Sequence, residues 1–238
     1  MIKKILIGII LIVTLISCSE KKENTLVLGV SPIPHKQIAE LIKEDLKKEG
    51  INLKIVEFTD YIQPNLGLRD KSLDANFFQH IPYMNEFGKK NHIDLVSVGS
   101  VHLEPIKLYS DKYTNIDQLP KNAKILIPND PTNKQRALQL LKNMKDISII
   151  SLNAEQIGPR LKEVDGAVIN TNFAISSKIP QNKAILVESK ESPYANIVTV
   201  LKGRENDDKI KKLMKALRSE KVKKYIETTY KGEIIPAF

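Results

Sequence analysis

The sequence contains few of the residues that would support disulfides, thiolate metal sites or covalent catalysis. Its 238 residues include one cysteine and no tryptophan, and aromatic residues make up 5% of the total. A single cysteine excludes an internal disulfide and a thiolate metal cluster, so packing must supply the stability. His-Glu-x-x-His and Gly-x-Ser-x-Gly are absent, and the only Ser-x-x-Lys match lies at residues 19–22, beside the cysteine. We therefore expect no catalytic residue and no cofactor.

Long apolar runs are also absent, apart from one at the start of the chain. Two lysines precede an apolar stretch at residues 5–16, which ends shortly before Cys18 and is shorter than the roughly 20 apolar residues that span a membrane. The pattern is typical of a secretory signal peptide with a lipoprotein cleavage site. We predict that residues 1–17 are removed and that Cys18 carries lipid, palmitate included. Residues 18–24 would then tether the body outside the cytoplasm. An uncleaved N-terminal anchor helix is the alternative.

The charge of the chain is positive but evenly spread. There are 37 basic and 28 acidic residues, giving a formal net charge of +9, and the lysines are scattered along helix-like segments. This distribution is typical of a solvated surface near an anionic membrane, and an exported chain is not expected to bind nucleic acid. No linker rich in Gly and Ser and no repeat of fixed period interrupts the body, which is long enough for two domains.

Strand-like and helix-like patterns alternate along the body. Strands are predicted at 26–30, 51–58, 75–78, 93–98, 124–127, 147–151, 167–170 and 197–201, and helices at 38–46, after 60, at 82–90, 132–144, around 161 and in the lysine-rich C-terminal part. The alternation favours a parallel α/β fold. The pattern restarts near Lys124, which indicates a second unit of the same class. The last segment, 234–238, fits either unit.

Polar and charged residues cluster where predicted strands end, which is where open α/β sheets bind ligands. Residues 127–133 form a turn rich in Asn, Asp and Pro, and Arg136 follows one helical turn later. The positive end of that helix and a bidentate guanidinium would together hold a carboxylate. Ordinary helix capping and a surface arginine are the alternative.

A second group, at residues 74–83, concentrates aromatic side chains at a junction between a strand and a helix. Phe78, His80 and Tyr83 lie in it, and Tyr61 precedes it in the chain. Such a group suits an apolar or thioether side chain, although core packing explains adjacent aromatics equally well.

Further strand ends carry amides, a histidine and one carboxylate. These residues are His102, Glu104, Asn170, Asn172 and Asn196. An Asn side chain accepts from an ammonium group and donates to a carboxylate, so the set is suited to a small zwitterion. Each signal is weak by itself, because Asn is common in turns.

Taken together and in this order, the stretches resemble the NlpA family of lipoproteins, the methionine-binding components of bacterial ABC importers. The matching blocks are residues 56–61, 63–66, 74–80, 127–133, 167–170, 192–196 and 234–238. The resemblance implies a two-lobed α/β periplasmic-binding-protein fold, type II-like, whose lobes are joined by two crossover segments near Pro105 and Tyr194. Lobe 1 would comprise residues 25–105 plus 196–238, and lobe 2 residues 106–195.

The resemblance also implies a role for each candidate residue. Arg136 would hold the carboxylate of L-methionine with Asn129 beside it, and Asn170, Asn172 and Asn196 would bind the rest of the amino-acid backbone. Tyr61, Phe78, His80 and Tyr83 would surround the thioether, with His102 and Glu104 at the cleft edge. The partners would be an ABC permease with its ATPase, and the receptor would work as a monomer.

Several alternatives stay open at this level. The alternatives to L-methionine as the ligand are D-methionine, a methionine-containing dipeptide and another small amino acid. A metal-binding lipoprotein is the more distant alternative, because the chain has four histidines. Their spacing matches no common zinc pattern, so no metal ligands are predicted.

Overall fold

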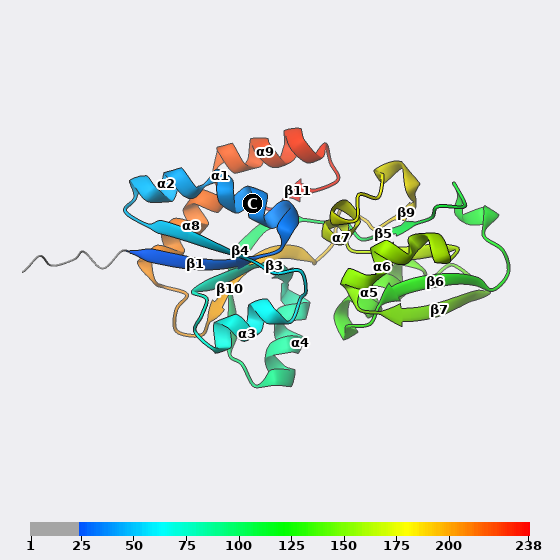
Figure 1. The fold of residues 1–238 in the computed structure, drawn as a ribbon, viewed down its shortest axis with the longest axis horizontal. Helices are drawn as coiled ribbons and strands as arrows, with labels where there is room; N and C mark the ends of the chain where they lie inside the picture. The colour runs from blue at the N-terminus through cyan, green and yellow to red at the C-terminus, as the bar shows by residue number, and fades with distance from the viewer. Residues whose placement is uncertain (1–23) are drawn as a thin grey trace, which may run out of the picture.

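The computed structural model describes residues 24–238, which form two α/β units side by side (Figure 1). The predicted signal peptide, Cys18 with its predicted lipid, and most of the predicted tether 18–24 lie outside the described residues. Across residues 24–238, no helix combines the length and the apolar character needed to cross a membrane.

The first unit is built on a six-stranded mixed sheet in the order β11-β4-β10-β3-β1-β2. Its strands are β1 (Thr25–Val30), β2 (Asn52–Glu57), β3 (Ala75–His80), β4 (Leu95–Leu103), β10 (Ala195–Leu201) and β11 (Ile235–Pro236). β1 runs parallel to β2 and β3, whereas β10 is antiparallel to both β3 and β4. The parallel arrangement that the alternation favours is present in β1, β2 and β3 but not in β10, because β10 returns from the second unit and enters in the opposite direction. The C-terminal segment belongs to this first unit.

Helices cover both faces of this sheet (Figure 1). They are η1 (Pro32–Lys36), α1 (Gln37–Leu41), α2 (Lys43–Lys48), α3 (Gln63–Arg69), α4 (Ile81–Asn91), α8 (Asp208–Leu217) and α9 (Glu220–Tyr230). In α8, Ile210, Leu213, Met214 and Leu217 recur at helical spacing and are buried in the core of this unit. The helix predicted at 38–46 is divided at Ile42, whose ψ of −1° departs from helical geometry.

The second unit is built on a five-stranded sheet in the order β7-β6-β8-β5-β9. Its strands are β5 (Lys107–Tyr109), β6 (Ala123–Pro128), β7 (Ile147–Leu152), β8 (Gly166–Ile169) and β9 (Ala184–Val187). Its helices are η2 (Ile116–Gln118), α5 (Pro131–Leu140), α6 (Ala154–Ile157), η3 (Gly158–Glu163), α7 (Thr171–Ser176) and η4 (Gln181–Lys183). β5 and β9 were not predicted; β5 has only three residues, which are too few to show a period.

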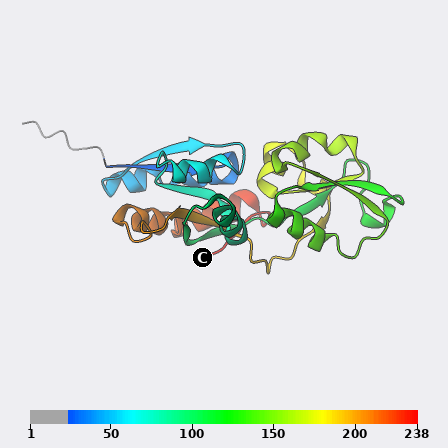
Figure 2. The ribbon, with the colours of Figure 1, turned by 90° about the horizontal axis from the view of Figure 1, so that it is seen from below.

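The chain passes between the two sheets twice, after β4 and again after β9. Figure 2 shows the two units from below, joined by these narrow connections. Each unit has its own buried apolar clusters, so each sheet is stabilised by its own helices. The division into residues 25–105 plus 196–238 and residues 106–195 stays a prediction, whose limits fall near these two connections.

Candidate functional site

A small cavity lies between the two units. Residues of the first unit and residues of the second line it together: Tyr61, Phe78, Gln79, His80, Tyr83, Glu104, Asn133, Arg136, Asn170, Thr171, Asn172 and Asn196. The strand ends of both sheets therefore meet at one place, as the position of ligand sites in α/β folds predicts.

One side of the cavity is aromatic. The rings of Tyr61 and Phe78 lie 5.8 Å apart between centroids, and those of Tyr61 and Tyr83 lie 5.9 Å apart. The Tyr83 hydroxyl donates to the backbone carbonyl of Tyr61 at 2.9 Å, which fixes both side chains. Phe173 packs against Tyr61 from behind, at 4.8 Å between centroids. This wall is rigid and apolar, and such aromatic edges favour thioether sulfur.

His80 connects this wall to the second unit. It is the N-cap of α4, and its Nδ1 accepts the backbone N–H of Tyr83 at 3.2 Å. Its Nε2 must therefore carry the proton, and it donates to Asn133 Oδ1 at 3.2 Å. Burial, with the nearby charge of Arg136, lowers the pKa of His80 to about 3, so the ring is neutral at physiological pH.

The amide of Asn133 is oriented by the residue that caps its helix. Asp130 accepts the backbone N–H of Asn133 at 2.9 Å and also its side-chain NH2 at 3.2 Å. The α5 N-terminus that the sequence offered for an anion is thus capped by the Asp130 carboxylate, although Arg136 is buried and not the surface residue of the capping alternative. With its NH2 engaged, Asn133 turns Oδ1 toward His80 and toward the Asn170 amide, which donates to it at 3.0 Å.

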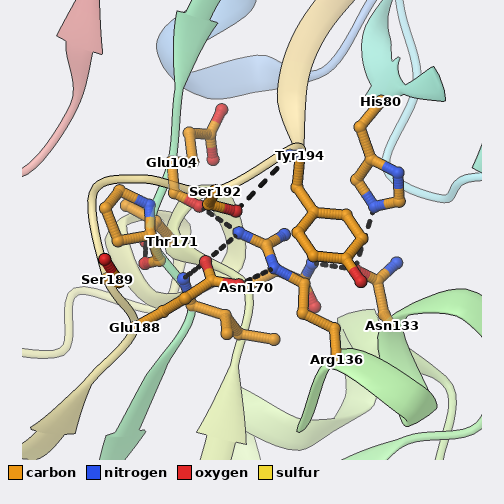
Figure 3. A network of polar contacts seen from close by, with 12 residues as sticks. His80, Glu104, Asn133, Arg136, Asn170, Thr171, Glu188, Ser189, Ser192 and Tyr194 are labelled. Carbon is orange, nitrogen blue, oxygen red and sulfur yellow. Dashed lines mark hydrogen bonds and ion pairs between the residues drawn. The ribbon is translucent and has the colours of Figure 1, made fainter. Parts of the chain in front are cut away.

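Arg136 is buried and already paired with a carboxylate (Figure 3). Its Nε donates to Glu188 Oε1 at 2.8 Å, and its Nη2 donates to Glu188 Oε2 at 2.5 Å and to the Glu104 carbonyl at 2.7 Å. The Tyr194 ring covers the guanidinium at 4.5 Å. Only Nη1 has no hydrogen bond to the described residues. Glu188 therefore occupies the edge of the guanidinium formed by Nε and Nη2, and the role of Arg136 in holding a carboxylate stays a prediction that depends on Nη1.

Two buried polar atoms on the cavity wall have no hydrogen-bond partner among residues 24–238: Asn170 Oδ1 and Asn172 Nδ2. The Asn170 NH2 group donates to Asn133, which leaves its oxygen free as an acceptor. The Asn172 oxygen accepts from the Tyr61 hydroxyl at 2.6 Å, which leaves its NH2 group free as a donor. One unused acceptor and one unused donor on the wall of the same cavity indicate a ligand with both kinds of group.

Glu104 is the buried carboxylate of the cavity. It accepts the backbone N–H of Asn172 at 2.9 Å through Oε2, and Nε2 of His102 lies 2.7 Å from its Oε1. Burial raises the pKa of Glu104, while His35, the Asn172 N–H and Arg136 act in the opposite direction. Burial also lowers the pKa of His102 to about 3, so that imidazole is a neutral donor.

His35, His102 and Glu104 are the one group among the described residues whose spacing would admit a metal ion. Oε1 of Glu104 lies 3.5 Å from Nε2 of His35 and 2.7 Å from Nε2 of His102. The Nδ1 atoms of both histidines are buried and have no partner in residues 24–238. A metal held through the two Nε2 atoms would leave two buried N–H donors unpaired, whereas metal-bound histidines almost always donate that N–H. The donor set therefore does not fit a metal centre.

The structure brings nine of the eleven predicted site residues to the cavity wall. His102 lies behind Glu104, and Asn129 is exposed on the outside, donating to Asn153 at 2.7 Å. Asn129 therefore does not join Arg136; Asn133, one helical turn further along, takes that position. The residues that the sequence did not reveal are His35, Gln79, Asn133, Thr171, Glu188 and Tyr194. Of these, Gln79, Asn133 and Tyr194 lie within stretches already singled out, and Thr171 lies between two predicted residues.

Comparison with known proteins agrees with this architecture. The family model described as NlpA lipoprotein matches residues 26–143 and 142–238. The methionine-binding lipoprotein MetQ of Bacillus subtilis is 37% identical, over 98% of this chain and 98% of that protein. The D-methionine-binding lipoprotein MetQ of Escherichia coli is 32% identical, over 92% of this chain and 91% of that protein. The structure of a nutrient binding protein from Burkholderia cenocepacia bound to methionine superimposes with a TM-score of 0.86 at 36% identity. The match covers 90% of this chain and 100% of that protein.

Proposed function

The chain belongs to the NlpA lipoprotein family, and from this we propose that it captures L-methionine in the cavity between its two units and delivers it to an ABC permease in the membrane. The relatives bind rather than transform their ligands, so the chain is a binding protein and not an enzyme. Its attachment would be the lipid on Cys18, outside the cytoplasm, and it would act as a monomer.

One observation carries the proposal: an aromatic wall faces a set of polar groups that suits a zwitterion. The free Nη1 of Arg136 and the free NH2 of Asn172 would bind the carboxylate. Glu104 and the free oxygen of Asn170 would bind the ammonium group. Burying both charges of an amino acid costs several kcal/mol for each ion unless both are paired, so both ends must be satisfied together.

The aromatic wall would select the side chain. Tyr61, Phe78 and Tyr83 line the cavity, and they offer ring faces and edges but no charge. A flexible thioether fills an irregular apolar space well and gains from contact with aromatic rings. The wall would therefore favour methionine over an amino acid with a polar side chain of similar length.

The cavity also suggests how binding is coupled to closure. Two hydrogen bonds join the units directly. Tyr61 of the first unit pairs with Asn172 of the second, and His80 of the first pairs with Asn133 of the second. A ligand that touches both walls adds contacts that exist only when the units are together, and it therefore favours the closed form. The closed form would be the one that docks on the permease.

The identity and hand of the ligand are tested by analysing what the protein carries. The full chain is purified in detergent from cells, its ligand is released by unfolding, and the extract is separated by chiral chromatography with mass detection. We expect L-methionine in near-stoichiometric amount. Recovery of D-methionine or of a methionine-containing dipeptide would select one of those alternatives, and recovery of another amino acid would overturn the methionine assignment.

A further inference from the structure

His35 lies directly behind the cavity wall, in a position that no role proposed above uses. It is contributed by η1, is 1% exposed, and is separated from Asn196 by 161 positions in the chain. Its Nε2 lies 3.1 Å from Asn196 Oδ1 and 3.5 Å from Glu104 Oε1. The ring is held between Phe77 and His102, with centroids at 4.7 and 4.9 Å. The ring packs against both neighbours, and its Nε2 edge faces the two oxygen atoms.

This orientation fixes where the proton of His35 resides. Nε2 faces two oxygen atoms, whereas Nδ1 is buried without a partner in the described part of the chain. A proton on Nδ1 would be a buried donor with no acceptor and would leave two acceptors facing a bare nitrogen. The proton therefore belongs on Nε2. Burial lowers the pKa of His35 to about 4, which agrees with a neutral ring.

The proton on His35 in turn fixes the amide of Asn196. An Asn side chain has an acceptor end and a donor end, and only the acceptor end suits a donating Nε2–H. Asn196 lines the cavity and is 6% exposed. With Oδ1 held by His35, its NH2 group has no hydrogen bond to residues 24–238, and it is the end left for the cavity.

We propose that His35 is a positioning residue: its Nε2–H holds Asn196 Oδ1, so that the Asn196 NH2 group is aimed at the carboxylate of the bound amino acid. The inference rests on the function proposed above. It makes the pair a determinant of specificity, because a ligand without a carboxylate gains nothing from a fixed donor. When His35 is replaced, the amide is free to turn, and the preference for a carboxylate falls.

A double-mutant cycle on the full chain in detergent tests this, with affinities measured by calorimetry. His35→Leu and Asn196→Ala should each weaken L-methionine binding on the order of tenfold, as expected for one hydrogen bond to a charged group. The double variant should bind no more weakly than Asn196→Ala alone. Losses that multiply would overturn the proposal, because His35 would then act without Asn196.

Two further variants separate positioning from general damage. His35→Gln keeps a side-chain N–H donor and should recover part of the lost affinity. Thr199→Val changes a buried hydroxyl on the same strand, β10, that has no partner in residues 24–238, and it should bind as the wild type does. The ratio of affinities for L-methionine and for 3-(methylthio)propylamine, which lacks the carboxylate, should fall in His35→Leu. An unchanged ratio would contradict the proposed role.

A measurement on the unaltered protein requires no variant to fold. The ¹⁵N chemical shifts of the histidine rings report which nitrogen carries the proton, and they should show Nε2 protonated in His35. A proton on Nδ1 would overturn the proposal directly. If the wild type binds no L-methionine, the proposed function fails, while the ring shifts still decide the state of His35.

Discussion

The guanidinium of Arg136 is held by the carboxylate of Glu188 through two hydrogen bonds, from Nε at 2.8 Å and from Nη2 at 2.5 Å. Glu188 follows β9 on the connection that returns to the first unit, and its Oε2 also accepts the backbone N–H of Ile106 on the other connection, at 3.1 Å. One ion pair thus joins the cavity to both connections. It also keeps the buried arginine paired before any ligand arrives.

Glu188→Gln should lower the free energy of unfolding by about 3 kcal/mol, because removal of one partner leaves a buried charge uncompensated. The side chains of Arg136 and Glu188 are 4% and 14% exposed. Urea denaturation of the empty protein measures the loss. Glu57→Gln is the matched control: its partner Lys36 is 45% exposed, and an exposed ion pair contributes little to stability. Equal effects of the two substitutions would contradict the importance of burial.

Arg136→Ala should abolish binding of L-methionine. An unpaired buried carboxylate costs about 3 to 5 kcal/mol, which corresponds to a loss of affinity on the order of 100- to 5,000-fold. Calorimetry on the full chain measures it, with Lys134→Ala, an exposed change in the same helix, as the control. An Arg136→Ala variant that binds within tenfold of the wild type would remove Arg136 from the carboxylate site.

Tyr61→Phe should weaken binding about fivefold to tenfold while keeping the aromatic wall. The substitution removes the hydroxyl that donates to Asn172 across the cavity, and it leaves the amide of Asn172 free to turn. Tyr113→Phe, which lies outside the cavity, is the control. If both variants bind L-methionine equally well, the bond between Tyr61 and Asn172 has no part in closure or in orienting the amide.

Acid should destabilise the protein through its buried histidines. Burial lowers the pKa of His35 to about 4 and those of His80 and His102 to about 3, from 6.5. Below pH 6.5 the unfolded chain takes up protons that the folded chain does not, so the free energy of unfolding falls by up to about 1.4 kcal/mol per pH unit for each histidine. The raised pKa of Glu104 opposes this, because the folded form protonates there first.

Urea denaturation between pH 7 and pH 4 measures this dependence. His80→Gln should reduce the slope of the free energy of unfolding against pH by the contribution of about one proton, because one buried histidine is removed. A profile that is flat between pH 6.5 and pH 4 would show that these rings are protonated in the folded state.

The sequence predicted the elements that are long enough to show a recognisable hydrophobic period. The alternation of strands and helices identified the α/β class, and nearly every strand of four or more residues was anticipated. β9 was the exception, and the three-residue β5 was also missed. The direction of β10 was beyond reach, because its antiparallel pairing with β3 and β4 depends on the chain's return from the second unit.

The sequence predicted site residues that lie close together along the chain. It missed residues that only folding brings together. Phe78, His80 and Tyr83 lie within one short segment, so their common wall was visible in the sequence. Glu188 meets Arg136 across 52 positions, and its local sequence carries no sign of a buried ion pair. Asn129 and Asn133 share one turn, and only the helix geometry after Asp130 decides which of the two faces the cavity.

The central claim is that the cavity binds L-methionine, and calorimetric titration of the full chain tests it most directly. The protein is first freed of carried ligand by unfolding and refolding in detergent. The account predicts tight one-to-one binding of L-methionine, with leucine and glutamine giving no comparable heat. A folded protein that gives no heat with L-methionine, or that binds glutamine as tightly, would contradict it.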